Sequence, residues 1–407
     1  MRKLLFHIGS LNMGGAEKSL VSLLNLLPEN KYNIDLLLIK DEGPLKESIP
    51  KHVNVLSVDF PYECLAVSPK NINYYLRKGL KYFFKKLYSL FRIISTRKLS
   101  MDQILWKIWR DDIPLLDKKY DAAISYIEGI TNYYVLEKVN AQRKIIWVHN
   151  EYSKLGYNAE YDFEYFKKAD VVVTISDLCQ SCLIKTFPSI ESKFSVLENI
   201  TNPSLIRNMS ELEIVDSEFI EPYDGLKILS IGRLHPQKQF HLAIKAAQII
   251  KASGIRFKWY IIGEGKLRQD LEQQIKVLKL TDEVILLGLR KNPYPYMRLC
   301  DMIVQSSLYE GKSIVVDEAK ILNKPIVATN YETVYDVIVD HKTGLISDMT
   351  PQSLAACIME VHNDRNIRNI LIENLINENN NNLDELQKYM SVIDGYMTLS
   401  DIILSNH

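Results

Sequence analysis

The chain has 407 residues, a hydrophobic content of 47% and a formal net charge of zero. This length predicts two or three domains with packed cores, and the balanced charge predicts no nucleic-acid partner. The five cysteines are odd in number and scattered, which favours a reducing compartment over a disulfide framework. The sequence has neither a signal peptide core nor an apolar run of the roughly 20 residues that a transmembrane helix needs, so we expect a cytoplasmic protein.

The first half of the chain alternates short apolar runs with helical patterns. This alternation predicts a doubly wound α/β domain with a parallel sheet. The loop before the first helix carries Gly14 and Gly15, which would let the backbone approach a ligand, although an ordinary strand-to-helix turn explains them as well. Strands are predicted at residues 3–8, 33–40, 53–58, 120–125, 144–148, 171–176 and 194–197, and an amphipathic helix at 17–27.

Residues 64–101 contain no Asp or Glu but many basic residues. A basic amphipathic helix with aromatic side chains suits the headgroup region of an anionic membrane, so residues 70–98 are expected to contact the inner face of the membrane. The alternative is a helix that packs on the N-terminal sheet with solvated lysines behind it. Large apolar residues recur here at helical spacing, at Leu80, Phe83, Phe84, Leu87, Phe91 and Ile94.

The predicted strand at 144–148 ends at His149. Ligands of doubly wound sheets bind at the carboxyl ends of the strands, so this histidine is a candidate site residue. A hydrogen-bonded loop residue is the alternative interpretation.

The second half opens with a predicted strand at 226–231, followed by a loop that contains Arg233 and Lys238. Such a pair at a strand's carboxyl end can grip a diphosphate from two sides, the Arg as a planar fork and the Lys as a point charge. Two solvated basic side chains are the alternative. Further strands are predicted at 258–262, before Gly263, and at 284–288, before Leu289, with helices at 240–253 and 267–278.

Residues 301–329 predict a unit of strand, loop, helix and strand, with the helix at 314–322 and Ser313 as its cap. Glu310 lies in the loop, and Glu318 follows about one turn into the helix, on the end that faces the loop. The amides of Lys312, Ser313 and Ile314 lie between the two carboxylates and are expected to hold an anion. A capped helix with two surface acids is the alternative.

Several of these patterns resemble glycosyltransferase family 4, whose members are retaining enzymes of the GT-B fold. The resemblance is weak before residue 140 and strong from 226 to 346, and it extends to bacterial capsular and exopolysaccharide glycosyltransferases. It implies an α/β protein with two Rossmann-like, doubly wound domains that face each other across a cleft. The patterns are Gly232-Arg233-Leu234-x-x-x-Lys238, Glu310-x7-Glu318-Ala319, Pro-Ile-Val-Ala-Thr at 325–329, and Thr343-Gly344-Leu345-Ile346.

The resemblance also implies how the chain is divided. We expect an acceptor-side domain at 1–203, an acidic linker at 204–224 and a nucleotide-sugar-binding domain at 225–385. A helix at 386–407 is expected to return to the first domain.

The resemblance assigns roles to residues of both domains. Arg233 and Lys238 would clamp the donor diphosphate, and Glu318 would accept hydrogen bonds from the ribose. Glu310 would hold and orient the donor sugar as a catalytic residue, and His149 would contact that sugar from the other domain. The other positions expected to border the nucleotide sugar are Gly15, Gly263, Leu289, Lys312, Ser313 and Ile314.

The expected reaction is retaining transfer of a sugar from a UDP-sugar to a glycan or lipid-linked saccharide, in the assembly of surface polysaccharides or glycoconjugates. No metal ion and no cofactor beyond the nucleotide sugar is expected. Two departures from the family pattern bear on the choice of donor: Lys312-Ser313 stands where most members have Phe-Gly, and Gln239 where Gly is usual. The alternatives are a nucleotide-sugar epimerase or hydrolase of the same fold, and a non-catalytic partner subunit of a transferase.

Overall fold

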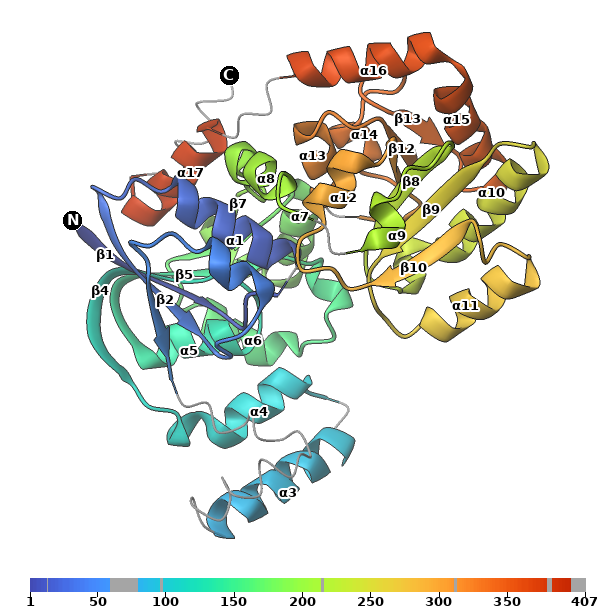
Figure 1. Cartoon of the computed structure of the whole chain (residues 1–407). Helices are drawn as coiled ribbons and strands as arrows, with labels where there is room; N and C mark the ends of the chain where they lie inside the picture. Colours follow the sequence, from blue (N-terminus) through green and yellow to red (C-terminus); the bar gives the residue numbers. More distant parts are fainter. Residues whose placement is uncertain are drawn as a thin grey trace. The chain divides into compact units, whose positions relative to one another are not determined.

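The computed structural model describes residues 1–12, 14–58, 80–95, 98–213, 216–310, 313–378 and 383–396 (Figure 1). The chain divides into two compact units, each built around its own sheet. The first unit contains residues 1–200 and the described residues from 383 onward, and the second contains residues 201–382.

The described strands of the first unit form one parallel sheet in the order β3-β2-β1-β4-β5-β6-β7. The order reverses between β1 and β4, which is the switch point of a doubly wound sheet, as the alternating pattern predicts. The strands are β1 (Arg2–Ile8), β2 (Tyr32–Leu38), β3 (Asn54–Ser57), β4 (Leu116–Ser125), β5 (Val139–Val148), β6 (Val171–Thr174) and β7 (Phe194–Val196). The helices are α1 (Gly15–Leu26), α3 (Leu80–Ser95), α4 (Met101–Trp109), α5 (Ile130–Lys138), α6 (Ala159–Phe166), α7 (Asp177–Thr186) and α17 (Leu383–Asp394).

The second unit repeats this plan with described strands in the order β10-β9-β8-β11-β12-β13, all parallel. Its switch point lies between β8 and β11. The strands are β8 (Leu226–Ile231), β9 (Phe257–Ile262), β10 (Val284–Gly288), β11 (Met302–Gln305), β12 (Ile326–Thr329) and β13 (Leu345–Ser347). The helices are α8 (Pro203–Ser210), α9 (Ser217–Ile220), α10 (Phe240–Ala252), α11 (Arg268–Val277), α12 (Tyr294–Leu299), α13 (Ile314–Ile321), α14 (Val334–Val337), α15 (Pro351–Asn363) and α16 (Arg365–Asn377).

The strands of the second unit send successive side chains into two different cores. Ile228 and Trp259 pack with side chains of α10, α11 and α15. Their neighbours Leu229 and Tyr260 pack with side chains of α8, α12, α13 and α14. This alternation follows from the pleat of a β-strand, and it explains why these strands read as continuous apolar runs with both faces buried.

The expected linker at 204–224 is wrong for its described residues, because they belong to the second unit and contain α8 and α9. Ile206 and Phe219 are buried in the core that α12 and α13 share. The amide of Asn292 donates to the carbonyl of Met209 at 2.7 Å, and Arg290 forms an ion pair with Asp216. Only a few separate apolar residues hold this acidic stretch against the core. They are too few to give the helical repeat of apolar residues from which a helix is recognised in a sequence.

Helix α17 packs on the first unit through its last residue and its buried aromatic face. The Asp394 carboxylate, whose side chain is 2% exposed, accepts from Arg2 at 2.9 Å, from the Tyr32 hydroxyl at 3.0 Å and from Lys31 at 2.6 Å. The ring of Tyr389 stacks on Trp147 at 5.8 Å between centroids. The helix is therefore an integral part of the first unit.

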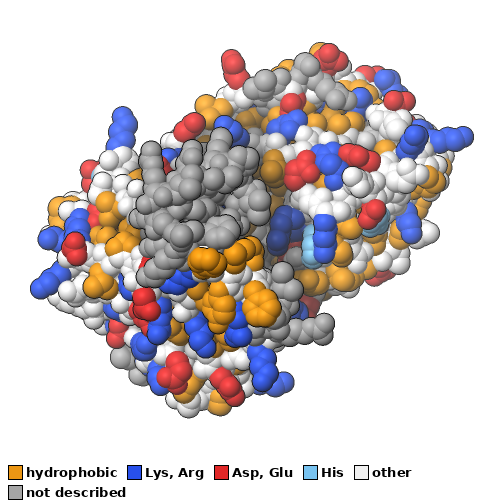
Figure 2. Space-filling model, turned by 90° about the horizontal axis from the view of Figure 1, so that it is seen from below, with side chains coloured by type: hydrophobic (Ala, Val, Ile, Leu, Met, Phe, Trp, Pro, Cys, Tyr) orange, Lys and Arg blue, Asp and Glu red, His pale blue; other side chains and the backbone are white. Residues whose placement is uncertain are grey.

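Helix α3 packs on α4 by one face and exposes the other. Lys85 pairs with Asp112, and the Ser89 hydroxyl accepts from the Trp109 indole at 2.9 Å. Of the predicted basic segment at 70–98, residues 70–79, 96 and 97 lie outside the described residues. Figure 2 shows large hydrophobic side chains beside lysines and arginines on the face that carries α3. The exposed side chains of α3 are Phe84, Leu87, Tyr88 and Phe91.

None of the described helices has the length and apolar character that crossing a bilayer requires.

Replacing Asp394 with Ala is expected to destabilise the first unit by about 2 kcal/mol, because charged donors lose their shared acceptor. Urea unfolding followed by tryptophan fluorescence measures this loss. Asp384→Ala is the control, since Asp384 lies exposed on the first turn of the same helix, and it should cost less than about 1 kcal/mol. Equal losses in the two variants would show that Asp394 does not hold the helix in place.

Candidate active site

The loops that follow β8 and β11 are tied together at the switch point of the second sheet. Both loops leave the same edge, because the two strands are parallel neighbours. The backbone N–H of Leu308 donates to the Gln237 carbonyl at 2.7 Å, and the Ser306 hydroxyl donates to the Lys238 carbonyl at 2.8 Å. The Gln237 amide donates to the Tyr309 carbonyl at 3.0 Å. The two loops therefore form a single structural element.

The Glu310 carboxylate is fixed inside this element. Its Oε1 accepts from Lys238 Nζ at 2.5 Å, from Gln305 Nε2 at 2.9 Å and from the Ser307 hydroxyl at 2.5 Å. The Thr333 hydroxyl donates to the Glu310 carbonyl at 3.0 Å, which also fixes the backbone. The Glu310 side chain is 10% exposed. A carboxylate with three donors on one oxygen has a defined direction, as a group that orients a substrate requires.

The two cations of the predicted diphosphate clamp are in different states. The Arg233 side chain is exposed and forms no hydrogen bond or ion pair with the described residues. Lys238, at the end of a 3-10 turn (Pro236–Lys238), is paired with Glu310. Its alkyl chain passes over Gly232, where an added Cβ would lie 3.0 Å from the lysine Cε. A phosphate that bound there would therefore meet one exposed cation, Arg233, and a second cation, Lys238, that is already paired with a carboxylate.

Gly263 lies where the loop after β9 meets the loop after β8. A Cβ at this position would lie 1.9 Å from the Gly232 carbonyl oxygen, so no other residue fits without moving the backbone. The Gly263 N–H donates to the Gly288 carbonyl at 2.9 Å. Leu289 follows at the end of β10, and its side chain is 70% exposed. The predicted nucleotide-side positions thus follow neighbouring strands at one edge of the sheet.

Helix α13 begins beside Glu310, but Ser313 does not cap it as expected. Ser313 occupies the position before the first helical residue, Ile314, yet within the described residues its hydroxyl makes no capping bond. The hydroxyl donates instead to Gln305 Oε1 at 2.7 Å. Ser313 and Ile314 are both buried. Lys312 lies outside the described residues.

Glu318 lies one turn into α13 and is 1% exposed. Its Oε1 accepts from the hydroxyl of Tyr294, on α12, at 2.8 Å. Burial, and then the charge of Glu318, raise the pKa of the Tyr294 phenol well above its ordinary range, so this phenol remains a donor. The predicted role of Glu318 toward a ribose stays a prediction.

His149 follows β5 in the first unit and is buried. Its Nε2 lies 2.9 Å from the Tyr126 carbonyl, which can only accept, so Nε2 carries the proton and Nδ1 is the acceptor nitrogen. Burial lowers the pKa of His149, while the nearby Glu128 opposes that shift. Glu128 also accepts from the backbone N–H of His149 at 2.9 Å. The imidazole is therefore a neutral acceptor near pH 7, suited to a hydroxyl group.

Gly15 is the exposed first residue of α1, after β1, at the same sheet edge as His149. The Glu17 carboxylate folds back over Gly14, the residue before the helix. A Cβ added to Gly14 would lie 2.1 Å from Glu17 Oε2. Burial raises the pKa of Glu17. The glycine before the helix therefore makes room for a side chain of the chain itself, in addition to any ligand that binds there.

Two polar partners of the predicted residues were missed by sequence reasoning. Gln305 ends the strand Met302–Gln305 and is 6% exposed, and its signal is the one polar side chain in that apolar run. Tyr294 carries no comparable signal, because tyrosines are common in buried cores.

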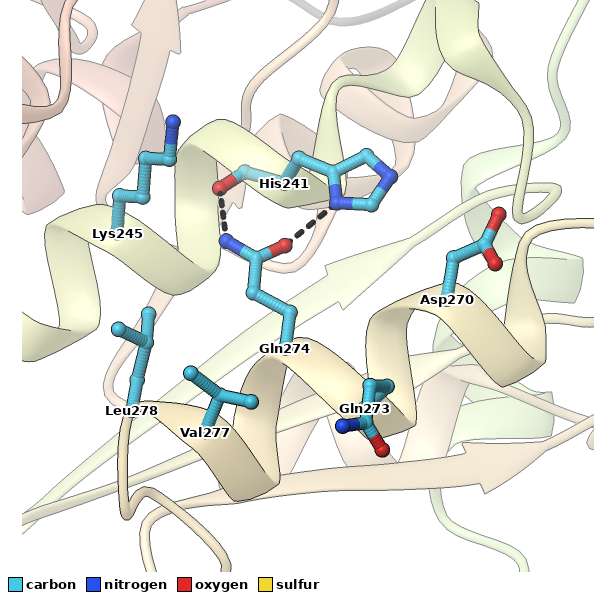
Figure 3. A pocket seen from close by; sticks show the side chains of 7 residues that line it. All are labelled: His241, Lys245, Asp270, Gln273, Gln274, Val277 and Leu278. Atoms are coloured by element: carbon cyan, nitrogen blue, oxygen red, sulfur yellow. Dashed lines mark hydrogen bonds between the residues drawn. The ribbon is translucent and has the colours of Figure 1, made fainter.

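A separate pocket of 430 Å³ lies between α10 and α11 (Figure 3). The side chains of His241 and Gln274 hydrogen-bond to each other across it, and the Gln274 amide donates to the His241 carbonyl at 3.0 Å. None of the predicted site residues lines this pocket. In the described parts of the chain, no three His, Cys, Asp or Glu side chains come together as a metal site requires.

The sequence around this site matches a known protein family. Residues 216–378 match the family described as glycosyl transferases group 1. This range contains both tied loops, together with Arg233, Lys238, Glu310 and Glu318.

Two curated proteins and one solved structure illustrate the similarity. An uncharacterised glycosyltransferase of Methanocaldococcus jannaschii is 28% identical over 60% of this chain and 65% of its own length. The Campylobacter jejuni N-acetylgalactosamine-N,N'-diacetylbacillosaminyl-diphospho-undecaprenol 4-alpha-N-acetylgalactosaminyltransferase is 27% identical over 86% of this chain and 87% of its own. Anabaena HepE in complex with UDP aligns with a TM-score of 0.64 at 17% identity, over 97% of this chain and all of the other. That likeness concerns the fold.

Gly263→Ala is expected to destabilise the second unit strongly, because its Cβ would overlap the Gly232 carbonyl. Gly254→Ala is the matched control: Gly254 has φ +83° but no atom within 4 Å of an added Cβ. The control should cost about 1 kcal/mol, and Gly263→Ala at least twice as much. Urea unfolding measures the free energy of unfolding of both variants. Equal losses of stability would show that the loop after β9 is not in close contact with the loop after β8.

Proposed function

Because residues 216–378 match the group 1 glycosyl transferases, we propose that this chain transfers a sugar from a UDP-sugar to a lipid-linked saccharide with retention of anomeric configuration. The observation that carries the proposal is the Glu310 carboxylate, held by Lys238 on the two tied loops. This places a fixed hydrogen-bond acceptor for sugar hydroxyls beside cations suited to a diphosphate.

The donor half of the proposal rests on charge. Departure of a nucleoside diphosphate leaves negative charge on an oxygen, and preorganised donors stabilise that charge. Arg233, Lys238 and the amides at the start of α13, at Ser313 and Ile314, would provide them without a metal ion. Lys312, which departs from the Phe usual in the family, would add a further cation. The UDP bound to Anabaena HepE, which shares the fold, supports a uridine nucleotide.

The roles of the two glutamates follow from their surroundings. Glu310 has one oxygen with three donors, and its other oxygen makes no hydrogen bond to the described residues, so it can accept from the donor sugar. Glu318 is buried against Tyr294. It would accept hydrogen bonds from the ribose if the ribose lies at the start of α13. Both glutamates belong to one loop and helix, so they do not flank the scissile bond as the paired acids of a glycosidase do.

The acceptor half rests on the first unit and on a relative. The name of the Campylobacter jejuni relative specifies an acceptor on diphospho-undecaprenol and an α-linked product. An α-linked product is what retention gives from an α-configured nucleotide sugar. His149, a neutral acceptor through Nδ1, would contact the donor sugar, and the loop at Gly15 would border the phosphates and the acceptor.

If the acceptor is linked to a membrane lipid, the exposed face of α3 could hold the protein on the same membrane. Four large side chains of that helix are exposed, and residues 64–101 contain no acid that an anionic membrane would repel. The alternative, in which this apolar face packs on the N-terminal sheet, does not fit the exposure of these side chains. We expect peripheral binding to the inner face of the membrane.

Glu310→Gln should lower kcat by about 100-fold or more while the protein stays folded, because the amide would present a donor where the sugar needs an acceptor. The substrate is the UDP-sugar that most raises the melting temperature in a panel, tested with a polyprenyl-diphosphate saccharide. Glu332→Gln, an exposed glutamate in the loop after β12, is the control. Wild-type turnover in Glu310→Gln would remove this residue from the mechanism, and nucleotide release without an acceptor would favour a hydrolase or epimerase.

The wild-type protein should float with vesicles of phosphatidylglycerol and phosphatidylcholine at low salt. The double variant Phe84→Ser/Phe91→Ser should not, because it removes two exposed aromatic side chains from one face of α3. Val277→Ser, at an exposed apolar position on α11, is the control and should float like the wild type. If the double variant floats as well as the control, α3 does not contact the membrane.

A further inference from the structure

Gln305 is a buried polar side chain at the edge of the candidate active site. Its amide is used at both ends: Nε2 donates to Glu310 Oε1 at 2.9 Å, and Oε1 accepts from the Ser313 hydroxyl at 2.7 Å. A carboxylate can only accept, so the amide nitrogen must face Glu310 and the amide oxygen must face Ser313. The chemistry of the three groups therefore permits a single arrangement.

The bond from Ser313 replaces an ordinary local interaction. A serine in this position before a helix usually accepts from a helix amide, whereas this hydroxyl points to Gln305. A glycine at this position could not donate a side-chain hydrogen bond. The hydroxyl and the glutamine thus form a connection that depends on this chain's own residues.

We propose that Gln305 is a positioning residue that, with Ser313, couples the Glu310 carboxylate to the start of α13. The proposal rests on the proposed function, since it concerns the direction of Glu310 during transfer. In the structure, Glu310 Oε1 is shared by Lys238, Gln305 and Ser307. A bound diphosphate attracts Lys238 away from the carboxylate, and Gln305 and Ser307 then hold it in place.

This coupling also links the two parts of the donor that must be aligned. The start of α13 would face the diphosphate, and Glu310 would face the sugar. Gln305 lies at the end of β11, on the rigid sheet, and bonds to both sides. A shift of about 1 Å in a positioned group can lower a rate by 10²-fold, so this link acts on kcat more than on nucleotide affinity.

The test compares Gln305→Met, which keeps the length of the side chain but removes both hydrogen bonds, with Ser313→Gly and the double variant. Gln305→Met should lower kcat by about 10-fold or more, with the donor KM and the Kd for UDP changed by less than about 2-fold. Ser313→Gly should lower kcat by about 3-fold. The double variant should be no slower than Gln305→Met, because each single substitution already breaks the same chain of hydrogen bonds from Ser313 through Gln305 to Glu310. Gln273→Met, at an exposed position of α11, is the control for the Gln-to-Met change.

Three results would overturn the inference. One is a wild-type kcat in Gln305→Met, and another is a double variant whose losses multiply in full, which would make the two residues independent. The third is a KM that rises together with a fallen melting temperature, which would show a purely structural role. If Gln305→Met does not fold, Ser313→Gly decides alone, and a wild-type kcat in that variant rejects the coupling. A wild-type protein that turns over no nucleotide sugar would instead reject the proposed function itself.

Discussion

The hydrogen bonds between the loop after β8 and the loop after β11 are the interaction on which the candidate site depends. The Leu308 N–H and the Ser306 hydroxyl donate from the loop after β11 to the loop after β8, and we call this contact between the two loops the seam. Each of these hydrogen bonds contributes about 1 kcal/mol of net stability. The seam brings Lys238 and Glu310 together where water is largely excluded. Such an ion pair adds little stability, because both groups lose hydration. Under the proposed function, it would hold two opposite charges in place for a substrate that carries both phosphate and hydroxyl groups.

The first unit applies the same topological rule with different chemistry. Two segments lie at the carboxyl edge of its sheet, the loop after β1 and the residues after β5. The first contains Gly15, which has no side chain, and the second contains the neutral imidazole of His149. The neutral His149 imidazole carries no positive charge that would attract a phosphate, and its Nδ1 can accept a hydrogen bond from a hydroxyl group. The exposed apolar face of α3 belongs to the same unit. Under the proposed function, this unit would therefore meet the lipid-linked acceptor.

The sequence predicted the fold well, because a parallel sheet with both faces covered needs continuous apolar strands that are easily recognised. The loop at 232–238 and the helix after Glu310 were likewise placed correctly, since glycines and strand ends mark them. The expected linker at 204–224 failed because a few anchors such as Phe219, rather than a periodic pattern, tie it to the second unit. The direction of the Ser313 hydroxyl could not be predicted, because it depends on Gln305, which only the folded sheet brings beside it.

Hydrogen–deuterium exchange of the whole protein with and without UDP tests the central claim most directly. The account predicts slower exchange in the loop at 232–239 and in the segment at 306–314 together, because the seam makes them one binding element. Protection confined to the pocket between α10 and α11, or protection of one loop without the other, would contradict it.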